Sequence, residues 1–137
     1  MKIMIDTNVL LDSMLDRKPI SEDAQVLLEQ CARGEYEGCI LSSTITDVFY
    51  IARKSMKDLH QIYLLMDDFM EDMLLIGVQN GDVMDALGRR EPDFEDCLLS
   101  ICAEKAKCDF IITRNVKDFK NSNVSAITPR EFMKLKS

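Results

Sequence analysis

Short apolar runs alternate with amphipathic segments along this chain, and that alternation restricts its fold more than any other feature. The strand-like runs are brief and mostly apolar, at residues 2–5, 39–41, 74–78, 110–112 and 124–127. The segments between them carry apolar residues at helical spacing, at residues 7–15, 21–34, 44–55, 59–70 and 93–106. Buried strands separated by helices are typical of a mainly parallel sheet with helices on both faces. We therefore predict one α/β domain with a mainly parallel sheet over residues 1–137.

Polar residues and glycine predict where several helices begin and end. Ser21 is expected to cap the second helix, and Gly34 is a good left-handed stop for it. Asp93 is expected to cap the helix that leads into the 110–112 strand, and Thr128 to cap the last helix.

Composition disfavours several classes of protein. No apolar run approaches the ~20 residues needed to cross a bilayer, so no membrane partner is expected. Five cysteines without a Cys-x-x-Cys pair, and a single histidine at His60, disfavour structural zinc and histidine-based catalysis. The chain opens directly on a strand-like run without a secretory signal, so we expect a cytoplasmic protein.

The charge balance limits how a nucleic acid could bind. The chain has 24 acidic and 17 basic residues, for a net charge of −7, which opposes attraction of a polyanion over the whole surface. A bound divalent cation would reverse the sign of the field locally. Acidity therefore predicts weak, metal-dependent binding without excluding a nuclease.

Acidic residues follow or precede the predicted strands where a ligand would bind. In open parallel sheets, ligands bind at the carboxyl ends of strands near the reversal of strand order. Asp6 follows the first strand, Asp47 lies one turn into the helix after the second, and Asp118 follows the 110–112 strand. Asp96 lies in the first turn of the helix before that strand, where acids are also common for purely structural reasons.

A group of four carboxylates would be suited to one kind of chemistry. Carboxylate oxygens are hard ligands for Mg²⁺ or Mn²⁺, which activate water and neutralise charge on a phosphate. Asp47 favours this interpretation because Tyr50 and Ile51 offer it no ion pair within its helix. Asp6 favours it because an acid next to a buried strand is costly to desolvate unless it is paired or metal-bound.

At these residues the chain resembles the PIN-domain family, including its bacterial VapC-like toxin subgroup. The segments that carry the resemblance are Ile5-Asp6-Thr7-Asn8-Val9-Leu10-Leu11-Asp12, Ser42 to Ile51, Asp93-Phe94-Glu95-Asp96 and Phe110 to Phe119. Their order and spacing are specific to the family, although each segment alone is a weak match. The family's second acid is often Glu, so Asp47 is shorter by one methylene group.

The resemblance implies a three-layer PIN-like fold, in which helices flank a mainly parallel central sheet. It also implies a metal-dependent endoribonuclease that cleaves single-stranded RNA. Its metal-binding and catalytic acids would be Asp6, Asp47, Asp96 and Asp118, with one or two Mg²⁺ or Mn²⁺ ions. Supporting polar groups would be Thr7, Asn8, Thr113 and Asn115, and it is open whether Asn115 or Asp118 is the fourth ligand. Weak candidates for RNA contact are Arg53, Lys54 and Arg114. The resemblance also implies an antitoxin partner and a homodimer formed through exposed apolar helical faces around Leu27 or Tyr63.

Two other functions fit the same pattern. A catalytically silent PIN-like module would bind RNA or protein without cleaving, although the presence of all four acids argues against it. A phosphatase of the haloacid-dehalogenase type or a phosphoacceptor receiver domain would also place an Asp after a strand. The phosphatase normally has a second Asp at the position of Asn8. The receiver domain has acids at the positions of Met4 and Ile5.

Overall fold

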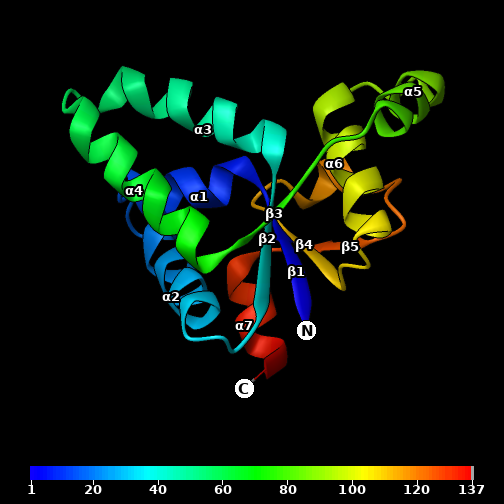
Figure 1. Ribbon diagram of the computed structural model, residues 1–137. Coiled ribbons are helices and arrows are strands. Elements are labelled where there is room, and N and C mark those ends of the chain that lie inside the picture. Colours follow the sequence, from blue (N-terminus) through cyan, green and yellow to red (C-terminus); the bar gives the residue numbers. More distant parts are fainter. Residues whose placement is uncertain (137) are drawn as a thin grey trace.

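A parallel five-stranded sheet forms the centre of the structure, a computed structural model that describes residues 1–136 (Figure 1). The strands are β1 (Lys2–Ile5), β2 (Glu37–Leu41), β3 (Leu74–Ile76), β4 (Phe110–Ile112) and β5 (Ser125–Ile127). They lie in the order β3-β2-β1-β4-β5, and every neighbouring pair is parallel. The predicted parallel α/β sheet is therefore confirmed.

Helices cover both faces of this sheet. They are α1 (Thr7–Met14), α2 (Ile20–Ala32), α3 (Ser42–Ser55), α4 (Leu59–Asp72), α5 (Asn80–Arg89), α6 (Phe94–Lys105) and α7 (Pro129–Lys136), with a 3₁₀ turn η1 (Val116–Phe119). One apolar cluster joins α1, α2 and α7 to Ile3 and Ile5 of β1. The other joins α6 to Met4 and Ile111 on the opposite face. Within residues 1–136, none of the helices combines the length and apolarity that a membrane span requires.

The helix ends follow most of the predicted signals. Asp93 caps α6 by accepting from the backbone N–H of Asp96 at 2.9 Å, and Thr128 accepts from the N–H of Glu131 at 3.1 Å. Gly34 has a left-handed φ of +79° just after α2. The prediction for Ser21 was wrong, because α2 begins at Ile20 and the Ser21 hydroxyl donates to Asp16 Oδ1 instead.

The prediction of an exposed apolar face around Leu27 was also wrong. Leu27 is fully buried, because the face of α2 that carries it packs in the cluster that includes Phe132 of α7. Tyr63 is 53% exposed, as expected. The cysteines of residues 1–136 are free thiols buried in the core.

The reversal of strand order lies between β1 and β4. The chain moves outward from β1 through β2 to β3, and then returns to the other side of β1 for β4 and β5. Asp6 and Thr113 follow these two neighbouring strands, and the Asp6 N–H donates to the Ile112 carbonyl at 3.0 Å. The fold therefore places Asp6 at the position where open α/β sheets bind ligands.

Candidate active site

An acidic pocket of about 440 Å³ lies at the carboxyl edge of the sheet. It is walled by residues from α1, α3, α6 and the segment after β4. Six acidic side chains line it: Asp6, Asp47, Asp93, Glu95, Asp96 and Asp118. The structure thus brings together the four acids that the sequence indicated, and adds Asp93 and Glu95.

Asp6 is the most deeply placed of these acids, at 7% exposed. Its Oδ1 accepts from the Thr7 N–H at 2.8 Å, and its Oδ2 accepts from the Thr113 hydroxyl at 2.8 Å. Burial raises the pKa of Asp6, the two hydrogen bonds oppose that rise, and the charges of Asp93 and Asp118 add to it. Asp6 is therefore held in one orientation within a strongly negative environment.

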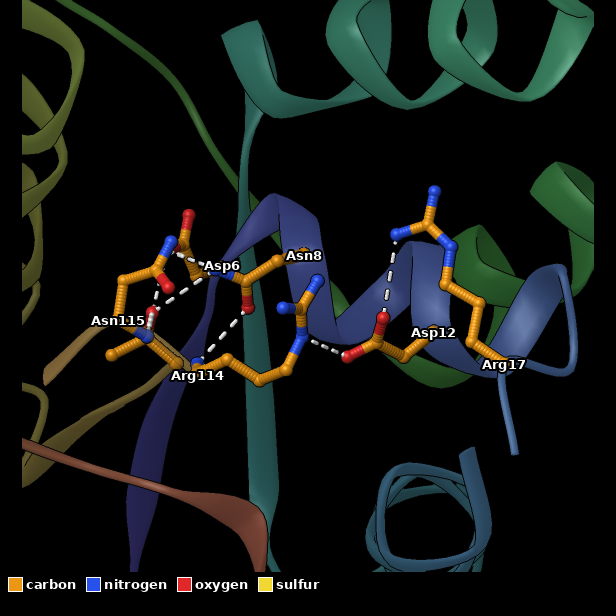
Figure 2. A network of polar contacts seen from close by, with 7 residues as sticks. Asp6, Asn8, Asp12, Arg17, Arg114 and Asn115 are labelled. Carbon is orange, nitrogen blue, oxygen red and sulfur yellow. Dashed lines mark hydrogen bonds and ion pairs between the residues drawn. The ribbon is translucent and has the colours of Figure 1, made fainter. Parts of the chain in front are cut away.

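The predicted supporting residues surround Asp6 in a connected network (Figure 2). The Asn8 side-chain amide donates to Asp6 Oδ2 and to Thr113 Oγ1, both at 3.3 Å. The Thr113 hydroxyl oxygen also accepts from the Asn115 N–H at 3.0 Å. Thr113 thus links the end of β4 to Asp6, while the Asn115 side chain lines the pocket.

Asp47 has a partner outside its own helix, and that partner is another acid. Glu95 of α6 shares a hydrogen bond with Asp47 of α3, and this bond, burial and the charge of Asp47 raise the Glu95 pKa to about 7. Two carboxyl groups can form such a bond only if one of them holds a proton. Sequence reasoning missed Glu95 because an acid in the first turn of a helix is usually explained by the helix dipole.

Asp96 is the second acid with a strongly shifted pKa. Burial, followed by the charges of Asp6, Asp93 and Asp118, raises it to about 7. Asp93 is exposed and reaches the same pocket while it caps α6. Like charges gathered in this way are costly, and a cation among them would remove that cost.

The donor chemistry fits a divalent metal ion. Within residues 1–136, no group of three His, Cys, Asp or Glu side chains stands ready to hold an ion directly. However, Asp6, Asp47, Glu95 and Asp96 together line a small cavity of about 20 Å³, with Thr7, Ser43 and Thr44. A cavity of at least ~10–15 Å³ accommodates one water-sized species. The acids therefore surround a space of the right size, lined by hard oxygen ligands.

A second cavity shares three acids with the acidic pocket. This neighbour has a volume of about 340 Å³, and Asp93, Asp96 and Asp118 line both spaces. Its lining includes the cations Arg89, Lys117 and Lys120. Because Asp118 and Asn115 both line the acidic pocket, either one is available as the fourth ligand.

The predicted RNA-contacting cations divide into two groups. Arg53 and Lys54 are exposed in the last turn of α3, where Arg53 Nη1 donates to the Lys57 carbonyl, and neither lines the acidic pocket. Arg114 lies close to the site, since its N–H donates to Asn8 Oδ1 at 3.1 Å. The structure therefore favours Arg114 over the other two.

The raised pKa values predict that the metal-free protein is more stable in mild acid. The carboxyls of Asp96 and Glu95 have pKa values of about 7, against ordinary values of 3.8 and 4.5. Between those limits the folded state binds protons that the unfolded state has lost, so stability falls as pH rises. In EDTA, we expect a higher thermal midpoint at about pH 5.5 than at about pH 8. The difference should be roughly 2–4 °C for each kcal/mol by which protonation of these carboxyls stabilises the folded state.

The control for this prediction is Asp96→Asn, which removes one titrating group and should flatten the profile. Asp82, whose pKa is lowered, titrates below this window and does not contribute. A wild-type midpoint that is constant, or that falls towards acid, would show that the pKa values of these carboxyls are not raised in the folded protein.

Comparisons with known proteins agree with this architecture. The family model described as "PIN domain" matches residues 2–117. No curated protein matches the chain in sequence. Similar solved structures include VapBC2 from Rickettsia felis bound to a promoter DNA fragment, with a TM-score of 0.69 at 19% identity, covering 93% of this chain and 98% of that one. A toxin-antitoxin complex from Klebsiella pneumoniae has a TM-score of 0.68 at 22% identity, covering 93% of this chain and 97% of that one.

A third similar structure is VapC20 of Mycobacterium tuberculosis, described as a Sarcin-Ricin loop cleaving toxin. Its TM-score is 0.65 at 10% identity, covering 80% of this chain and 86% of that one. At these identities the structures establish a shared fold. The family model spans residues 2–117 of the 137, so the chain belongs to the PIN-domain family.

Proposed function

We propose that this chain is an endoribonuclease that hydrolyses single-stranded RNA at the acidic pocket with the help of Mg²⁺ or Mn²⁺. The observation that carries the proposal is the convergence of Asp6, Asp47 and Asp96, from separate elements, on one cavity of about 20 Å³. Membership of the PIN family supports nuclease chemistry. The description of VapC20 as a Sarcin-Ricin loop cleaving toxin supports RNA as the substrate class.

The side chains of the pocket have distinct roles in this proposal. A bound divalent ion would lower the pKa of a water molecule and neutralise charge on the phosphate. Asp6, Asp47 and Asp96 would hold one or two such ions, with Asp118 or Asn115 as the fourth ligand. Thr113 and Asn8 hold the Asp6 carboxylate by hydrogen bonds, so it need not reorganise when the ion binds.

Glu95 extends this set beyond the residues expected from sequence. Its carboxyl meets that of Asp47, which is shorter by one methylene group than the Glu often found at that position in the family. The longer side chain of Glu95 reaches from α6 to the acid of α3. We propose that the Asp47–Glu95 pair together supplies the oxygen ligands on this wall of the pocket.

The test is cleavage of a labelled single-stranded RNA by the purified chain. We expect cleavage with Mn²⁺ or Mg²⁺, none in EDTA, and recovery when excess Mn²⁺ is added back. Cleavage that continues in EDTA would refute the metal-dependent mechanism. Binding of RNA and metal without cleavage would identify the silent PIN-like module instead.

The other phosphate-handling alternatives fit less well. Receiver domains have the strand order 2-1-3-4-5, whereas this sheet is ordered β3-β2-β1-β4-β5. The match to the PIN model, together with Asn8 at the place of the second Asp, disfavours a haloacid-dehalogenase-like phosphatase.

We also propose that the chain is the toxin of a toxin-antitoxin pair, acts in the cytoplasm and forms a homodimer. Toxin-antitoxin complexes among the similar structures support the first of these proposals. The exposed apolar side chains of α3 and α4 offer a surface for a protein partner: Tyr50, Leu59, Tyr63 and Leu64. Sedimentation velocity of the purified chain should report a dimer, and a monomer at micromolar concentration would argue against self-association.

A further inference from the structure

Without a bound metal ion, the acidic pocket would repel a phosphate. Six of its lining residues are acids, and the whole chain carries a net charge of −7. A substrate phosphate carries the same sign of charge and would be repelled before any metal contact forms. Among the residues that line this pocket in the described part of the chain, Arg17 is the one cation.

Arg17 is held in place by a carboxylate that has no part in the acidic pocket. Asp12 of α1 is fully buried, and its Oδ1 lies 3.4 Å from Arg17 Nη1. Its Oδ2 lies 2.5 Å from Arg114 Nε, so one buried carboxylate anchors two guanidinium groups (Figure 2). One arginine would neutralise Asp12, and the second leaves a surplus positive charge.

Both guanidinium groups are partly exposed: Arg17 lines the acidic pocket, and Arg114 lines a separate cavity of about 280 Å³, together with Asp23 and Thr128. The side chains of Arg17 and Arg114 are 39% and 34% exposed, whereas that of Asp12 is 1% exposed. Arg114 uses Nε and Arg17 uses Nη1 for Asp12, which leaves other N–H groups of each guanidinium for a ligand. Such forks match the oxygens of a phosphodiester.

The pair is also fixed relative to the proposed metal site. The backbone N–H of Arg114 donates to Asn8 Oδ1, and the Asn8 amide donates to Asp6 Oδ2. This chain of contacts runs from the buried Asp12 to the most buried acid of the pocket (Figure 2). A phosphate bound by the arginines would therefore stand at a defined distance from the scissile position.

We propose that Arg17 and Arg114, positioned by Asp12, form a clamp for a backbone phosphate of RNA beside the scissile phosphodiester. This inference rests on the proposed ribonuclease function and names how its substrate is held. The ligand is the phosphodiester backbone, so the clamp contributes affinity without selecting bases. Asp12 acts only as a positioning residue.

The test measures RNA binding rather than cleavage. In an Asp96→Asn background, a fluorescein-labelled single-stranded RNA is titrated by anisotropy at several KCl concentrations in Mg²⁺. Arg17→Ala should weaken binding by about tenfold and reduce the slope of log K against log salt by about 0.7 for each phosphate that the variant no longer neutralises. Arg17→Lys, which keeps the charge, should retain most of that slope.

The matched control is Arg33→Ala. Arg33 is exposed, pairs with Glu35 at 3.0 Å, and precedes β2 at the opposite edge of the sheet. If the Arg17→Ala and Arg33→Ala proteins have the same RNA affinity and the same salt slope, the proposed clamp is wrong. If the Arg17→Ala protein also loses thermal stability, Arg17→Gln and Arg114→Gln, which keep polar packing, repeat the comparison.

Two further binding measurements distinguish the clamp from recognition of the ribose and from a site for free phosphate. Single-stranded DNA of the same sequence should show the same reduction in slope, because the clamp binds phosphate and not the 2′-hydroxyl. Inorganic phosphate at matched ionic strength should not displace the RNA, and displacement would assign the site to free phosphate instead. If the wild type binds RNA with this slope but never cleaves it, the proposed function fails while the clamp stands.

Discussion

The Asp96→Asn protein should cleave RNA about 10²–10³-fold more slowly than the wild type. The substitution keeps the shape of the side chain but removes a carboxylate from the pocket where charge must be stabilised. It also removes a carboxyl group whose pKa is raised to about 7 by burial and then by the charges of neighbouring acids, so the thermal midpoint at neutral pH should not fall. Loss of activity without loss of stability distinguishes a functional acid from a structural one.

The matched control is Asp68→Asn on α4. Asp68 is an exposed acid that does not line the acidic pocket. Its substitution therefore changes the net charge by the same amount as Asp96→Asn but leaves the pocket intact. Its cleavage rate should equal that of the wild type within about a factor of two. Equal rates in the wild type and the Asp96→Asn protein would remove Asp96 from the mechanism.

Phe132→Ala should destabilise the protein by about 3–5 kcal/mol and lower its thermal midpoint by roughly 10 °C. Phe132 is fully buried and contacts the rings of Tyr36 and Phe110 at centroid distances of 5.0 and 5.9 Å. It lies on α7, beyond the end of the family match at residue 117. The prediction therefore tests whether the last helix belongs to the folding unit.

Leu135→Ala provides the comparison within the same helix. Leu135 is 59% exposed, so its truncation should cost about 0.5 kcal/mol or less. Similar midpoints for the two variants, as measured by differential scanning calorimetry, would mean that α7 does not dock on the core in solution.

The sequence predicted the fold well wherever a short-range signal decided it. The buried run at Lys2–Ile5 and the Phe110–Ile112 strand were evident from apolar content alone. Asp93 was recognisable as a helix cap from its position. Ser21 also resembled a helix cap, but that prediction was wrong because its hydroxyl donates to Asp16 instead. A capping signal shows that a bond is available, and tertiary contacts decide whether it forms.

The site was partly predictable for a topological reason. Asp6 and Thr113 follow neighbouring parallel strands, so their meeting follows from the sheet. A helix that leads into a parallel strand must begin at the same edge, so the first turn of α6 also faces the pocket. That argument would have identified Glu95 and Asp93, which were treated as ordinary acids of a helix start.

Other features depended on contacts that no sequence pattern reveals. Asp12 follows Val9, Leu10 and Leu11 in a largely apolar helix, and that placement is a sign of a buried partner. Its partners Arg17 and Arg114 are separated in sequence, and only the packed structure joins them. The burial of Leu27 also required knowledge of where α7 docks.

The most direct measurement is calorimetric titration of Mn²⁺ into the wild-type protein and the Asp96→Asn protein at neutral pH, without RNA. If the clustered carboxylates share a divalent ion, the wild type binds Mn²⁺ with defined stoichiometry, and Asp96→Asn binds it at least about tenfold more weakly. Equal Mn²⁺ affinities in the two proteins, or no binding by the wild type, would contradict the shared-ion site.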